Sequence, residues 1–101
     1  MSGILRGGDT RKGPAVYTRV QPTTDATLVL GVNSARIVAT LQNLGTVDVY
    51  IGSTPIVTTL TGKKVPVGHD LEDEDSTSAI YAITAAGTGD LHVEEVSMVA
   101  A

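Results

Sequence analysis

The segment from residue 35 to residue 52, ARIVATLQNLGTVDVYIG, repeats its side-chain pattern every two residues on both sides of a short turn sequence. A two-residue period is typical of a β-strand with one buried face, and an Asn/Gly turn between two such runs is typical of an antiparallel hairpin. The segment therefore predicts two strands joined at Asn43-Leu44-Gly45, with Arg36 on the face away from the core. The core-facing side chains are expected to be Ala35, Ile37, Ala39, Leu41, Val47, Val49 and Ile51.

The rest of the chain shows strand and turn signals at a spacing of roughly 8–12 residues and no helical periodicity. Further strands are expected at 15–20, 26–32, 56–60, 79–85 and 91–96, and Pro66 places 65–67 at a sheet edge. The polar segment 68–78 is predicted to be a surface loop. The fold class is therefore all-β, a small antiparallel β-sandwich or jelly-roll-like barrel of seven or eight short strands. Residues 1–14 are predicted to be an extended N-terminal arm, and residues 15–101 a single β domain.

The expected core is small because large rings are nearly absent. The 101 residues contain no Phe and no Trp, and only three Tyr. Val and Thr together supply 27 residues, which favours strands because β-branched side chains pack well on a pleated surface. Aromatic side chains bury the largest areas, so a core of small aliphatic residues gains from contacts with neighbouring subunits.

Charge is divided unevenly along the chain. The net charge is −4, but residues 1–20 carry +3 and residues 21–101 carry −7. A basic arm on an acidic body suits contact with an acidic neighbour, including a second copy of the chain. Nucleic-acid binding is not expected, because basic residues are few and no stacking aromatic residues accompany them. The residues expected to contact a partner are Ile4, Leu5, Arg6, Arg11 and Lys12.

Residues that could carry chemistry are few. Cys is absent, which excludes thiolate metal sites and cysteine nucleophiles. His69 and His92 are expected to face solvent. The acidic run 72–75 is interpreted as a solvated loop, with binding of calcium or of a neighbour's basic arm as alternatives. Gly87-Thr88-Gly89 is interpreted as a hairpin turn, since no helix follows it to form a phosphate site.

Several functions are therefore not expected. The sequence predicts no catalytic residue, no metal or cofactor site and no small-molecule substrate, so the chain is not expected to be an enzyme. No run approaches the roughly 20 apolar residues that cross a bilayer, so no membrane partner is expected. The N-terminal residues lack the apolar stretch of a secretory signal.

The order of turns resembles that of small tailed-phage virion proteins. The shared elements are the Asn43-Leu44-Gly45 turn, the Val49-Tyr50-Ile51-Gly52 ending, the loop from Gly62 to Gly68 and the closing segment from Ala79 to Val93. The resemblance covers about 60 residues and leaves out residues 1–20 and the tail. It implies a capsid decoration, or cement, protein or another small virion component. A decoration protein would be made in the host bacterial cytoplasm and located on the outer capsid surface of the virion.

Cement proteins of this kind bind the major capsid protein and clamp neighbouring coat subunits, often as homotrimers. The resemblance therefore implies two partners: the major capsid protein and further copies of the chain. The alternative is a carbohydrate- or host-surface-binding module of a phage tail spike or fibre, in which Tyr50 or Tyr81 would contact the ligand. The two hypotheses differ in the partner that the protein binds and not in its fold.

Overall fold

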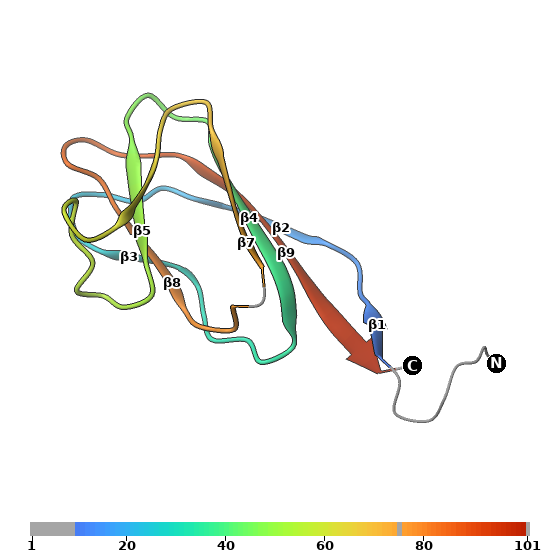
Figure 1. Cartoon of the computed structure of the whole chain (residues 1–101). Helices are drawn as coiled ribbons and strands as arrows, with labels where there is room; N and C mark the ends of the chain where they lie inside the picture. Colours follow the sequence, from blue (N-terminus) through green and yellow to red (C-terminus); the bar gives the residue numbers. More distant parts are fainter. Residues whose placement is uncertain (1–9, 75, 101) are drawn as a thin grey trace.

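The computed structural model describes residues 10–74 and 76–100, which form nine β-strands and no helix. The strands pack as two antiparallel sheets around one core (Figure 1), as predicted. Their bounds are β1 Thr10–Lys12, β2 Val16–Val20, β3 Thr27–Leu30, β4 Arg36–Asn43, β5 Val49–Gly52, β6 Lys63–Val65, β7 Asp70–Glu74, β8 Ile80–Ile83 and β9 Leu91–Ala100.

The strand order is that of a jelly roll. The first sheet runs β2-β9-β4-β7, with β1 continuing β2 along the same side of β9, and the second sheet runs β3-β8-β5-β6. Pairings are nested: β5 pairs with β6, β4 with β7, β3 with β8 and β2 with β9. This wrapped arrangement of eight antiparallel strands in two sheets defines the jelly-roll class.

The predicted hairpin at 35–52 is wrong in its pairing, although both of its strands exist. β4 pairs with β7 and β9 in the first sheet, whereas β5 pairs with β6 and β8 in the second. Residues 44–48 therefore carry the chain across the core from one sheet to the other. A hairpin and such a crossing give the same alternation, because both bury one face of each strand.

Three further boundaries differ from the sequence prediction. The expected loop at 68–78 contains the edge strand β7, and β9 continues beyond residue 96 to Ala100. The expected strand at 56–60 is a loop. Its backbone is held by local bonds instead of a ladder, because the amides of Leu60 and Thr61 donate to the hydroxyl of Thr58.

The core is aliphatic. Ala39, Leu41 and Val49 are fully buried, as the alternation predicted. They pack with buried side chains from β3, β8 and β9, namely Val29, Ile80, Ala82, Leu91 and Val93. None of the three tyrosines belongs to this cluster, so the rings remain available at the surface.

Arg36 lies in the buried layer and not on the solvent-facing side that the alternation predicted. The ladder between β4 and β9 shifts register between Arg36 and Val38, and this irregularity turns Arg36 inward, where it is only 3% exposed. Its guanidinium forms an ion pair with Glu95 at 2.8 Å. It also donates to the carbonyl oxygens of Gly31, Ser76 and Ser78.

The described end of the predicted arm belongs to the first sheet. Thr10–Lys12 pair with Met98–Ala100, at one tip of the molecule (Figure 1). The last pair between β4 and β9 joins Arg36 to Ser97, so this tip extends beyond β4. Gly13–Ala15 separate β1 from β2 along the edge of the first sheet. These three residues lie opposite only two residues of β9, so the ladder is irregular there.

Candidate functional site

The outer face of the second sheet is mostly apolar; its charged side chains are Lys64, beside Tyr50, and Asp48, which pairs with Lys64 at 3.4 Å. Its four strands contain only two charged residues, Lys63 and Lys64. Register places Leu28 beside Tyr81, and Tyr50 beside Ile83, on the side away from the core. Leu28 is 52% exposed, and the other three side chains are half-buried. We call this surface the tyrosine face; it consists of Leu28, Tyr50, Tyr81 and Ile83.

A loop from residue 53 to residue 62 borders the tyrosine face. Val57 is buried against Gly52, where a Cβ atom would lie 2.6 Å from the Cγ2 atom of Val57. Gly52 thus permits a close approach that fixes the loop beside β5. The same loop exposes Ile56 and Leu60 almost completely, at 82% and 95%, which extends the apolar surface past the edge of the sheet.

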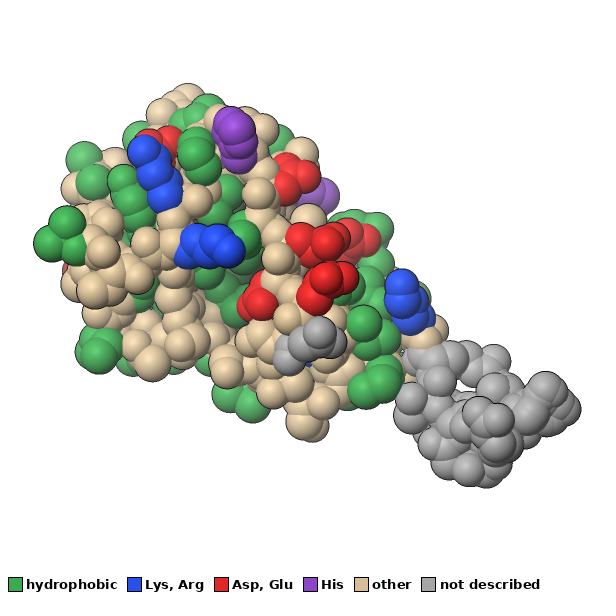
Figure 2. All heavy atoms as spheres, in the orientation of Figure 1, with side chains coloured by type: hydrophobic (Ala, Val, Ile, Leu, Met, Phe, Trp, Pro, Cys, Tyr) green, Lys and Arg blue, Asp and Glu red, His purple; other side chains and the backbone are tan. Residues whose placement is uncertain are grey.

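The outer face of the first sheet is polar and acidic. Register places Tyr17, Glu94, Thr40 and Glu72 in one row across four strands, and Arg19, His92, Gln42 and Asp70 in the next. The Tyr17 ring stacks on His92 with centroids 6.0 Å apart. Its hydroxyl donates to Glu94 at 3.1 Å, which raises the pKa of Tyr17 because the bond favours the protonated phenol. Figure 2 shows acidic side chains gathered on the molecular face that carries β7.

Arg19 and Asp90 form a two-bond ion pair beside this acidic face. The Nε and Nη2 atoms of Arg19 donate to the two carboxylate oxygens of Asp90 at 2.8 and 3.0 Å. These hydrogen bonds hold the pKa of Asp90 below its ordinary value; desolvation opposes them, and the charge of the guanidinium adds a smaller lowering effect.

We expect Arg19→Met to return the pKa of Asp90 toward its ordinary value of about 3.9. Because the pKa of Asp90 is lowered in the folded state, the pair stabilises the protein at pH values above the ordinary pKa. This stability is lost as the pH falls through the folded-state pKa. Carboxyl NMR titration of both proteins measures the shift. An Asp90 pKa that is the same with and without Arg19 would contradict this assignment.

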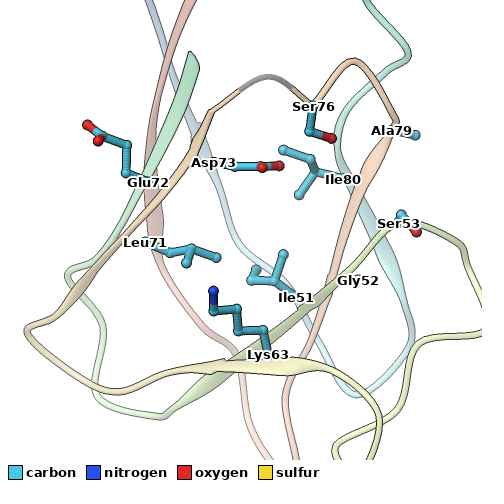
Figure 3. Close-up of a pocket in the computed structure, with 10 residues that line it drawn as sticks. All are labelled: Ile51, Gly52, Ser53, Lys63, Leu71, Glu72, Asp73, Ser76, Ala79 and Ile80. Atoms are coloured by element: carbon cyan, nitrogen blue, oxygen red, sulfur yellow. The ribbon is translucent and has the colours of Figure 1, made fainter. Parts of the chain in front are cut away.

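A cleft of about 200 Å³ opens between the edge strands β6 and β7. Its floor is apolar, formed by Ile51, Leu71 and Ile80. Lys63 and Asp73 extend toward it from opposite walls, whereas the Glu72 side chain points away (Figure 3). The described part of the chain provides no ion pair for Lys63 or Asp73.

The residues expected to contact a partner are only partly described. Ile4, Leu5 and Arg6 lie outside the described residues. Arg11 and Lys12 lie in β1 at the tip, and Lys12 is exposed. The structure therefore leaves the predicted role of the arm as a prediction.

The remaining motifs are placed as follows. His69 and His92 are exposed, as expected. The acidic run lies on β7 instead of in a loop, with Asp75 outside the described residues. Residues 87–89 lie in the connection between β8 and β9, where Gly87 has a φ of +73°. The predicted hairpin turn is wrong, because β8 and β9 belong to different sheets and do not pair. Within residues 10–74 and 76–100, no three potential metal ligands cluster, and no helix has the length and apolarity to cross a membrane.

The sequence predicts only part of the tyrosine face. Tyr50 and Tyr81 were named as separate candidates for a ligand contact, and the structure brings them onto neighbouring strands of one sheet. Tyr81 is opposite Gly52, two residues from Tyr50 along β5. Leu28 was missed, because only the pairing of β3 with β8 places it beside Tyr81.

Comparisons with known proteins show similarity of fold alone. No family model matches the chain, and no curated protein sequence matches it. The stem and receptor-binding domain of the spike protein P1 from bacteriophage PM2 aligns with a TM-score of 0.61 and 15% identity, over 81% of this chain and 33% of the spike chain. This chain thus spans about a third of the spike structure that it matches.

Two other solved structures give broader coverage. A Bacillus endospore appendage, from a family of disulfide-linked pili, aligns with a TM-score of 0.54 and 13% identity, over 95% of this chain and 96% of the appendage chain. A chain of the cyanophage Pam1 capsid aligns over 92% of this chain and 86% of its own length, at 17% identity and a TM-score of 0.42. The spike and appendage alignments establish that this jelly-roll fold is shared with a phage spike and a spore-surface fibre.

Proposed function

We propose that the chain is a structural virion protein of a tailed bacteriophage, a capsid decoration protein that binds the major capsid protein and stabilises its lattice from the outer capsid surface. The observation that carries the proposal is the contrast between the two sheet faces. One face is mostly apolar, with two tyrosines and the Lys64–Asp48 ion pair, and the other is acidic. The proposal gives the chain no catalytic role.

The tyrosine face has the composition of an interface core. Such cores are enriched in aromatic residues and depleted of charge, and tyrosine is common among the residues that dominate binding energy. Ile56 and Leu60, both almost fully exposed, add aliphatic area next to it. An acidic face turned to solvent would keep the decorated capsid soluble. We therefore assign the tyrosine face to the coat protein.

We expect Leu28→Asp and Tyr81→Asp each to reduce binding to capsids at least tenfold, because each places a charge at the centre of an apolar contact. The matched control is Thr40→Asp, which adds the same charge to the outer face of the first sheet and should bind normally. Capsids from a phage lacking the protein are mixed with each purified variant and pelleted. Circular dichroism of each variant confirms that it is folded.

Failure of the unchanged protein to pellet with capsids would refute the decoration role. Equal loss of binding in Thr40→Asp would refute the assignment to the tyrosine face. The two outcomes are distinct, since the first concerns the partner and the second concerns the surface.

A second candidate function is a carbohydrate- or host-surface-binding module of a phage tail spike or fibre. Two observations favour it: Tyr50 and Tyr81 share one exposed sheet face, and the matched PM2 structure is a stem and receptor-binding domain. Saturable binding to a glycan, lost in Tyr50→Ala and Tyr81→Ala, together with no binding to capsids, would favour this module over a decoration protein.

A further inference from the structure

The first sheet ends in two edge strands that each pair on one side only. Among the described residues, β2 pairs with β9 alone and β7 pairs with β4 alone. All three ladders between them are antiparallel, so β2 and β7 run in opposite directions. A second copy in the same orientation would therefore bring its β2 antiparallel to β7 of the first, with core-facing sides on the same side.

The two edges carry opposite charge. β1 and β2 contain Arg11, Lys12 and Arg19 and no acidic residue, whereas β7 contains four acidic residues and no basic one. Arg19 remains 64% exposed although it is paired with Asp90. Like charges opposite each other destabilise a strand pair, so β7 rejects a second β7 and favours a basic strand.

The two edges also fit in shape and polarity. Val16 lies opposite Glu95 on the core-facing side of β2, at the rim of the sandwich, and is 57% exposed. At the opposite rim, the cleft between β6 and β7 leaves Ile51 and Leu71 partly uncovered beside the buried Ile80 (Figure 3). The exposed Val16 side chain on the β2 edge could therefore pack against the apolar floor of the cleft beside β7.

We propose that copies of the chain associate head to tail, with β2 of one copy added to β7 of the next as an antiparallel strand. Val16 of the added strand covers the apolar floor of the cleft, and Arg19 of that strand lies on the outer face with the acidic residues of β7. The contact joins two different surfaces, so it closes into a ring, such as a trimer, or continues as a filament. It does not depend on which partner the tyrosine face binds.

We expect Val16→Lys to weaken self-association at least tenfold, because a charge on the core-facing side of an edge strand blocks strand addition. Leu44→Lys is the matched control: Leu44 is 58% exposed but lies in the crossing after β4, so its association should equal that of the unchanged protein. Sedimentation velocity over a range of concentrations measures the association. An unchanged protein that stays monomeric at every concentration would overturn the proposal, and so would a Val16→Lys variant that associates normally.

The absence of cysteine allows a direct test of which edges meet. Val16→Cys and Asp73→Cys proteins, one carrying a mass tag, are oxidised separately and as a mixture. The proposal requires a disulfide-linked pair of one Val16→Cys chain with one Asp73→Cys chain. Cross-linking confined to identical chains would show that like edges meet and would overturn it. Neither experiment uses capsids, so its result is independent of the decoration role.

Discussion

Replacing Arg36 with methionine should lower the free energy of unfolding by about 3–5 kcal/mol, the usual cost of removing one partner of a buried ion pair. The Arg36 side chain is fully buried, and that of Glu95 is 19% exposed. Without the guanidinium, Glu95 retains, among the described residues, a single 3.2 Å side-chain bond from the Asn33 amide. The carbonyl oxygens of Gly31 and Ser78, which accept 2.7 Å bonds from Arg36, also lose a partner.

Arg19→Met is the matched control for this effect. Arg19 pairs with a carboxylate through two hydrogen bonds, but its side chain is 64% exposed, so solvent screens the pair and its loss should cost much less than the loss of Arg36. Urea unfolding followed by circular dichroism measures both variants. The double variant Arg36→Met/Glu95→Leu should recover part of the loss, because it removes the unpaired charge. Equal destabilisation by Arg36→Met and Arg19→Met would refute the role assigned to the buried pair.

The sequence identifies core positions in β4 and β5 but not the partners of these strands. Period-two alternation correctly placed Ala39, Leu41 and Val49 inside. It could not reveal that β4 and β5 belong to different sheets, because alternation reports burial of one face and carries no information on the neighbouring strand. In a jelly roll, nested pairing makes β5 and β6 the innermost consecutive pair, and the other pairs join residues far apart in the sequence.

Polar composition concealed two features of the first sheet. β7 was predicted to be a loop because its sequence is DLEDE, yet an edge strand needs only one core contact here, and Leu71 supplies it. Arg36 was assigned to the opposite face because a register shift cannot be read from side-chain order. Both errors arise where the ladder is irregular or ends, which is where local sequence determines structure least.

The candidate surfaces depend on the same long-range pairing. The sequence shows that Tyr50 and Tyr81 each occupy a strand, and that basic and acidic residues lie in separate segments. Only the strand order places both tyrosines on one face and the oppositely charged strands β2 and β7 at opposite edges. Function proposed for a small β domain therefore depends more on sheet order than on any single motif.

Replacing Asn43 with alanine should lower the free energy of unfolding by about 3 kcal/mol or more, because it leaves buried backbone groups without partners at roughly 1–3 kcal/mol each. Asn43 is fully buried where the chain leaves the first sheet. Its amide nitrogen donates to the carbonyl oxygens of Val47 and Val65, each at 2.9 Å, and its amide oxygen accepts from the Gly45 N–H at 3.0 Å. One side chain thus holds the crossing between sheets against the end of β6.

Thr46→Ala is the control for this second substitution, since Thr46 is exposed in the same crossing and its loss should change stability by no more than about 0.5 kcal/mol. Urea unfolding gives both free energies, and amide hydrogen exchange gives a local readout. In Asn43→Ala the Gly45 N–H loses its acceptor, so its exchange should accelerate more than that of the buried β9 amides, which follow global unfolding. If Asn43→Ala and Thr46→Ala were equally stable, with Gly45 exchanging at the same rate in both, the crossing would be held by the packing of its neighbours and not by the asparagine.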